Sequence, residues 1–138
     1  MKYHLDTNIC VFMTKHHPHV MTAYAEHKDA GVAISSIVLA ELQFGVINSQ
    51  HIEKNRNALI KLLLNLDVLP FDGHAAAAYG PICTSLRRRG QTIGPMDMLI
   101  AAHAKADGAI LITNNTREFA RVEGLALEDW MQEIQKEA

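Results

Sequence analysis

Short apolar segments alternate with longer segments of helical periodicity along the chain, and this alternation limits the possible folds more than any other feature. Buried strands are predicted at residues 2–5, 32–35, 67–69, 109–113 and 125–127. Helices are predicted at residues 7–15, 18–28, 36–49, 52–66, 73–89 and 96–106. Pro81 is expected to kink or split the fifth helix. Strands that alternate with helices predict an α/β fold with a central, mostly parallel sheet of four or five strands flanked by helices.

The composition is typical of one globular domain spanning residues 1–138, because 49% of the residues are hydrophobic and only 20% are charged. The formal net charge of −2 means that any nucleic-acid binding must depend on local basic patches. Cys10 and Cys83 are expected to be reduced core thiols. We expect a cytoplasmic protein, because Asp6 comes too early for a secretory signal and no apolar run is long enough to cross a membrane.

Three acidic residues lie in apolar sequence, where a carboxylate is costly unless it is paired or bound to a metal. Asp6 follows the first predicted strand, and Asp97 follows a Gly-Pro-Met segment. Glu41 lies on a predicted helix whose same face carries apolar residues such as Phe44. Carboxylate oxygens are the ligands that hard divalent cations prefer, so the three acids together predict a metal site.

Each acid could also have a purely structural role. Asp6 is well placed to be a helix N-cap, and Asp97 in a first helical turn suits the helix dipole. Glu41 could form an ion pair with an arginine. These alternatives stay open for each residue taken alone.

The expected sheet topology favours a common site. The carboxyl ends of parallel strands share one edge of the sheet, and ligands bind there. Asp6 follows the first strand and the polar segment 113–119 follows the fourth, so both should face that edge. This segment is either an ordinary turn leading into a short helix or a set of groups that extends the acidic site and positions a water.

Taken in order, four segments resemble the PIN-domain ribonucleases, and most closely the VapC-type toxins of bacterial toxin–antitoxin pairs. The matching segments are residues 5–8, 35–45, 94–104 and 113–119, and the close of the chain at 124–130 is similar as well. The resemblance covers nearly the whole chain. It implies a PIN-like three-layer fold and a metal-dependent endoribonuclease that cuts RNA through a metal-activated water, with transfer RNA as one candidate substrate. It also implies products with 5′-phosphate and 3′-hydroxyl ends.

The resemblance also implies roles for individual residues. Asp6, Glu41 and Asp97 match the three main acidic positions of the family, and Glu118 is the nearest match to the fourth. Asp6 and Asp97 are the expected direct ligands of Mg²⁺, with Mn²⁺ as the alternative ion. The expected supporting residues are Thr7, Thr113 and Asn115.

RNA requires positive charge near the acidic residues. Arg87, Arg88 and Arg89 end a predicted helix, and Arg117 follows the fourth strand, so we expect these side chains to contact phosphates. The alternative for the arginine triplet is stabilisation of a helix C-terminus together with solubility.

The resemblance implies a VapB-type antitoxin as partner, with a segment that folds into a groove and blocks the acidic site. A homodimer and a hetero-oligomer with the antitoxin are expected, and no membrane contact. Residues 52–66 are more apolar than one core-facing side requires, so they are a candidate for the antitoxin groove, for a homodimer face or for core packing.

A phosphatase, a silent binding module and a zinc protein have less support from the sequence. A phosphatase that forms an aspartyl-phosphate commonly needs a second aspartate where this chain has Asn8. A silent binding module would be expected to lack one of the main acids, and all three are present. The histidine-rich segment 15–19 lacks the framework of a zinc site, and His103 and Trp130 are expected to be structural.

Overall fold

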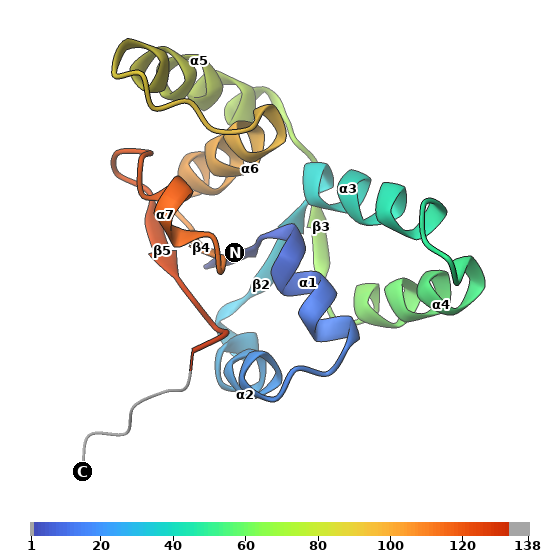
Figure 1. Cartoon of the computed structure of the whole chain (residues 1–138). Coiled ribbons are helices and arrows are strands. Elements are labelled where there is room, and N and C mark those ends of the chain that lie inside the picture. Colours follow the sequence, from blue (N-terminus) through green and yellow to red (C-terminus); the bar gives the residue numbers. More distant parts are fainter. Residues whose placement is uncertain (1, 133–138) are drawn as a thin grey trace.

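The computed structural model describes residues 2–132 and contains a five-stranded sheet in which all neighbouring strands run parallel (Figure 1). The strands are β1 (Tyr3–Leu5), β2 (Val32–Ser35), β3 (Asp67–Leu69), β4 (Ile110–Ile112) and β5 (Ala126–Glu128). Their order is β3-β2-β1-β4-β5, so the chain builds outward from β1 on one side and then returns to add β4 and β5 on the other. The predicted α/β fold with a parallel central sheet is confirmed.

Seven helices in the described part of the chain surround the sheet. They are α1 (Thr7–Thr14), α2 (Pro18–His27), α3 (Ser36–Ile47), α4 (Ile52–Leu63), α5 (Gly73–Arg88), α6 (Pro95–Ala106) and the single-turn α7 (Thr116–Phe119), with a 3₁₀ turn at Lys28–Ala30. Helices α5 and α6 pack together on one side of the sheet, and α1 and α2 lie on the other (Figure 1). Helices α3 and α4 form a hairpin beyond the β3 edge (Figure 1).

The core lies on both faces of the sheet. Leu5, Ile34 and Leu111, one from each central strand, are fully buried, as expected for a parallel sheet covered on both sides. Cys10 and Cys83 are free and buried, as predicted. Within residues 2–132, no helix has both the length and the apolar character needed to cross a membrane.

The predicted elements agree closely with the observed ones, and the differences have local causes. The predicted helices 36–49 and 52–66 both end early, because polar side chains bond to the last carbonyls. Asn48 Nδ2 donates to the carbonyl of Phe44 (2.9 Å), and Asn65 Nδ2 donates to that of Lys61 (3.3 Å). Pro81 does not split α5, which continues through it. The segment after β4 does lead into a short helix, α7.

Candidate active site

Asp6 lies at the carboxyl end of β1 and begins α1. Its side chain is buried, and both oxygens have partners: Oδ1 accepts from the backbone N–H of Thr7, and Oδ2 accepts from the hydroxyl of Thr113, each at 2.8 Å. Burial raises the pKa of Asp6, the two hydrogen bonds from Thr113 and Thr7 lower it, and the nearby charge of Glu41 raises it. Asp6 is therefore a helix N-cap and also an acid held at the sheet edge.

Glu41 lies in the second turn of α3 and faces Asp6 across the sheet edge. The hydroxyl of Thr7 donates a 2.6 Å hydrogen bond to Oε1 of Glu41, and its backbone N–H donates to Asp6, so the first residue of α1 contacts both acids. Within residues 2–132, the only ion pairs are those of His4 and His103 with Asp107. The proposed arginine partner for Glu41 is therefore absent from the described part of the chain.

Asp97 is the third residue of α6, in the first turn of the helix. Burial raises the pKa of its half-buried carboxyl group to about 6, and the charges of Asp6, Glu41 and Glu118 add to the increase in that order. A carboxylate in the first turn of a helix would normally be stabilised by the helix dipole. Burial and the charges of the other acids outweigh this effect at Asp97, so its pKa is raised and not lowered.

Glu118 reaches this site from α7. Asn115 Nδ2 donates to Glu118 Oε2 (3.1 Å), and the backbone N–H of Asn115 donates to the hydroxyl of Thr113 (3.0 Å). Because Thr113 also donates to Asp6, a continuous series of hydrogen bonds connects Glu118 to Asp6. The structure thus brings together the four acids and the three supporting residues expected from the sequence.

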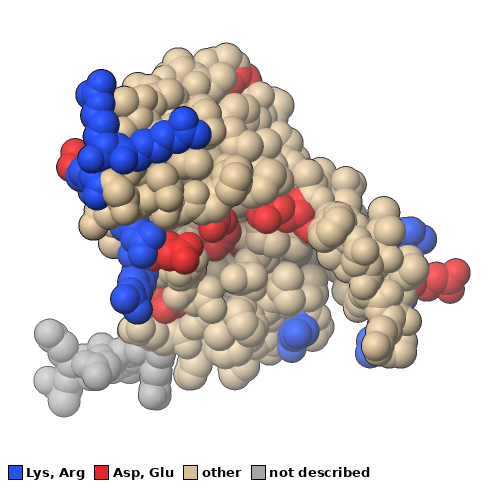
Figure 2. All heavy atoms as spheres, turned by 45° about the horizontal axis from the view of Figure 1, so that its top comes forward, with Lys and Arg blue, Asp and Glu red and all other residues tan. Residues whose placement is uncertain are grey.

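The donor set consists of oxygens. Figure 2 shows acidic side chains in a row across a hollowed part of the surface, with Lys and Arg side chains gathered toward one end. Among residues 2–132, no three His, Cys, Asp or Glu side chains are gathered closely enough to form a complete metal site. Since Mg²⁺ usually takes one or two protein carboxylates and keeps several waters, the donor chemistry fits a hard divalent cation.

The arginines expected to bind RNA are all exposed, but they differ in whether their side chains already form hydrogen bonds within the protein. Arg87 and Arg88 are exposed in the last turn of α5, and Arg117 is exposed on α7. Arg89 is also exposed, but its guanidinium donates to the backbone carbonyl of Arg121 (2.6 Å) and to the side chain of Gln91 (2.8 Å). Arg89 therefore ties the end of α5 to the loop after α7.

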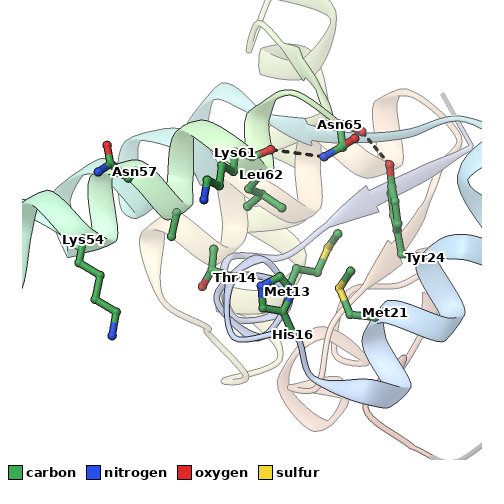
Figure 3. A pocket seen from close by; sticks show the side chains of 11 residues that line it. Met13, Thr14, His16, Met21, Tyr24, Lys54, Asn57, Lys61, Leu62 and Asn65 are labelled. Carbon is green, nitrogen blue, oxygen red and sulfur yellow. Dashed lines mark hydrogen bonds between the residues drawn. The ribbon is translucent and has the colours of Figure 1, made fainter.

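Two hollows lie between the helices on the α1 side of the sheet. The larger, about 470 Å³, lies between α1, α2 and α4, and Figure 3 shows Met13, Met21 and Leu62 lining it beside Lys54 and Lys61. The smaller, about 330 Å³, lies between α1, α3 and α4 and is lined in part by Thr7 and Glu41. Only the smaller of these two hollows opens directly onto the acidic site.

Sequence reasoning missed one group of buried polar residues near the site. His4 on β1 is buried and contacts Asp107 at the end of α6, while His103, which was expected to be structural, is buried beside Ser35. The signal that could have revealed the group is a histidine in the middle of an apolar strand, where an aliphatic residue is usual.

Comparison with known proteins shows the family to which the chain belongs. The PIN domain family model matches residues 3–125. The ribonuclease VapC2 of Rickettsia felis is 45% identical over 132 residues, which cover 94% of this chain and 98% of that protein. The tRNA(fMet)-specific endonuclease VapC of Shigella flexneri is 42% identical over 130 residues, with 94% and 98% covered. The solved structure of VapBC2 from Rickettsia felis bound to a DNA fragment from their promoter superposes with a TM-score of 0.91 at 42% identity, covering 94% of this chain and 99% of that chain. The chain therefore belongs to the PIN domain family and, within it, to the VapC group.

Proposed function

We propose that this protein is the toxin of a toxin–antitoxin pair and acts as an endoribonuclease that requires a divalent cation, with Mg²⁺ as the expected ion and Mn²⁺ as the alternative. The observation that carries the proposal is the grouping of four acids from distant parts of the chain at one edge of the sheet, where hydrogen bonds hold Asp6, Glu41 and Glu118. The raised pKa of Asp97, caused by burial and by these three acids, supports it. Such clustering is unfavourable for folding alone and is typical of sites that bind metal.

The acids and their hydrogen-bond partners have different proposed roles in the site. Asp6 and Asp97 are the proposed direct ligands, and Glu41 would hold a second ion or a coordinated water. When bound, the cation would activate a water and neutralise the charge of the scissile phosphate. Thr113 and Thr7 fix the orientation of the Asp6 and Glu41 carboxylates through the hydrogen bonds described above. Asn115 holds Glu118 toward the same site.

Transfer RNA is the first substrate to test, since the relative from Shigella flexneri is named as an endonuclease specific for tRNA(fMet). Purified wild-type protein is expected to cut total bacterial RNA into discrete fragments in Mg²⁺ and to leave it intact in EDTA, with initiator transfer RNA as the defined substrate. The matched control is Asp6→Asn, which should produce no fragments. Identical fragments from wild type and Asp6→Asn would point to a contaminating nuclease and contradict the proposal.

The exposed arginines at the end of α5 are the proposed phosphate contacts. Replacing Arg87 and Arg88 together by alanine is expected to weaken RNA binding without changing the melting temperature, because neither side chain is buried. Each lost phosphate contact should also reduce the dependence of log Kd on log salt concentration by about one unit.

The matched control for this pair is Arg89→Ala. It removes a residue that holds the loop after α7, so it should lower the melting temperature as well. If the Arg87/Arg88 double variant binds RNA with wild-type affinity and salt dependence, the end of α5 lies outside the substrate path.

A VapB-type antitoxin is the proposed partner, since the structural relative from Rickettsia felis was solved as a VapBC2 complex. The hollow between α1, α3 and α4 suits an apolar segment of the antitoxin, and its border at Glu41 would allow a basic side chain to reach the acids. The α3–α4 hairpin also exposes large apolar side chains, and we assign this face to a homodimer or to the hetero-oligomer with the antitoxin. These side chains are Phe44, Ile47, Ile60 and Leu64.

A further inference from the structure

Four buried or half-buried polar side chains connect the elements that carry the three main acids. Ser35 ends β2, His103 lies on α6, Asp107 caps the end of α6, and His4 lies in the middle of β1. His103 Nδ1 is 2.7 Å from Ser35 Oγ, and His4 Nε2 is 2.8 Å from Asp107 Oδ2. His103 Nε2 lies 3.7 Å from the same Asp107 oxygen. We call these four residues the histidine network.

Two hydrogen bonds hold the network together. Since a carboxylate only accepts, the Nε2–H of His4 donates to Asp107. His103 Nδ1 and Ser35 Oγ share the second bond, whereas His103 Nε2 is too far from Asp107 to form one. The oxygen of Ser35 meanwhile accepts the backbone N–H of Ile37 (3.1 Å), which caps α3. Thus one network links the start of α3 to β1 through α6.

The network is an unfavourable way to fill this part of the core. His4 is 1% exposed, and its Nδ1 is buried without a hydrogen-bond partner among the described residues. An unpaired buried nitrogen loses its hydration without compensation, whereas an aliphatic side chain in the same strand would carry no such penalty. The presence of His4 is therefore poorly explained by stability alone.

The position of the network relative to the acids suggests what it does. His4 and Asp6 are two residues apart on extended chain, so their side chains leave β1 on the same face. Ser35 caps the helix that carries Glu41, and His103 and Asp107 belong to the helix that carries Asp97. The ring of His103 is also held between those of His4 and Phe71, with centroids 5.0 Å and 5.5 Å away and near-perpendicular planes.

We propose that Ser35, His103, Asp107 and His4 are positioning residues that fix the spacing of β1, α3 and α6, and thereby the spacing of the three main acids that receives the divalent cation. This inference rests on the proposed function. Because the carboxylates repel one another, their spacing has to be imposed by the elements that carry them. A misplacement of about 1 Å in such a site can cost about 100-fold in rate, so small shifts of these elements are sufficient.

The sharpest test is His4→Leu, which removes the unpaired nitrogen and keeps a large side chain in the strand. We expect the melting temperature in EDTA to stay equal to that of wild type or to rise, because Asp107 is partly exposed and can turn to water. At the same time kcat should fall by about 10- to 100-fold, with KM for RNA within about twofold of wild type. The affinity for Mn²⁺, measured by calorimetry without RNA, should also fall.

A second comparison uses His103. His103→Leu removes the link to Ser35, whereas the amide of His103→Asn can occupy the position of Nδ1 and restore it. We expect His103→Asn to recover most of the kcat and Mn²⁺ affinity that His103→Leu loses. The matched control is His74→Leu, which removes a histidine bond between α5 and the carbonyl of Ala106 but leaves the network intact. It should keep wild-type kcat and Mn²⁺ affinity.

The outcomes separate this inference from the proposed function. If wild type cuts no RNA under any divalent cation, the proposed function fails. If wild type cuts RNA but His4→Leu keeps wild-type kcat and Mn²⁺ affinity, the positioning role is refuted, and a fall in melting temperature alone would assign the network to stability. Should His103→Leu fail to fold, His4→Leu and His103→Asn still decide the question.

Discussion

Asp97→Asn is expected to abolish RNA cleavage and, above pH 6, to make the metal-free protein as stable as wild type or more stable. Cleavage should fall by about 1,000-fold or more, because the variant loses a proposed metal ligand and with it the stabilisation of charge in the transition state. Stability should rise because the amide removes one of four clustered charges. The two effects have opposite directions, which distinguishes a functional residue from a structural cap.

The pH dependence of stability follows from the raised pKa of Asp97, which is about 6 in the folded protein. The folded state holds this proton more tightly than the unfolded state, so the free energy of unfolding of wild type falls as pH rises from about 4 through 6. The loss should be roughly 1 kcal/mol once solvent screening of the half-buried group is allowed for. Asp97→Asn should lack this decrease, so the two proteins converge below pH 4 and separate above pH 6.

Urea unfolding in EDTA at several pH values between 4 and 8 would measure this difference. A variant that is markedly less stable than wild type at pH 7 without metal would contradict the expected repulsion among the clustered acids. Asp97 would then act mainly by stabilising the first turn of α6.

Adding Mn²⁺ to chelator-treated wild type is expected to restore cleavage completely and to raise the melting temperature by about 5 °C at ten times the dissociation constant. A ligand that binds only the folded state stabilises by about 1.4 kcal/mol at that concentration, which corresponds to several degrees for a chain of 138 residues. The thermal shift should grow with pH between 5 and 7, because protonated Asp97 competes with the cation.

The control for this experiment is the same titration of Asp97→Asn, which should show little thermal shift. Glu53, an exposed acid on α4, supplies a second control, because Glu53→Gln should leave the shift unchanged. An equal shift in wild type and Asp97→Asn would place the bound cation elsewhere on the protein.

Much of the fold could be predicted because each local signal agreed with the global one. The strand at residues 32–35 and the start of α3 at Ser36 were predicted at their observed positions, since apolar run, cap and helical pattern follow one another directly. The meeting of Asp6 with the segment after β4 also followed from the parallel topology, because those strands are neighbours.

Glu41 lies among apolar residues whose surroundings differ from those expected. In the sequence, Glu41 shares its helix face with apolar residues such as Phe44, yet Phe44 is 70% exposed, and Ile47 further along the helix is 64% exposed. Helix α3 is apolar nearly all round, and part of this apolar surface is exposed among the residues that the structure describes. Hydrophobic periodicity in the sequence cannot distinguish a helix face that packs in the core from an apolar face that binds another polypeptide.

Long-range polar contacts were the least predictable part of the site. The bond from Arg89 to the carbonyl of Arg121 spans 32 residues, and that between His4 and Asp107 spans 103. Neither hydrogen bond could be predicted from secondary-structure propensity or hydrophobic periodicity, because both depend on how α5 and α6 pack against the sheet. The sequence could therefore suggest phosphate-binding arginines but could not show that one of them is already engaged.

The strand order has a consequence for the synthesis of such a nuclease. Strand β4 pairs directly with β1 near the middle of the sheet, although it is almost the last strand to be made. Asp6 receives its bond from Thr113 only after β4 has docked, and Glu118 comes later still. A nascent chain therefore carries three of the acids before Thr113 and Glu118 have been made, so the four acids can come together only after β4 and α7 have been added.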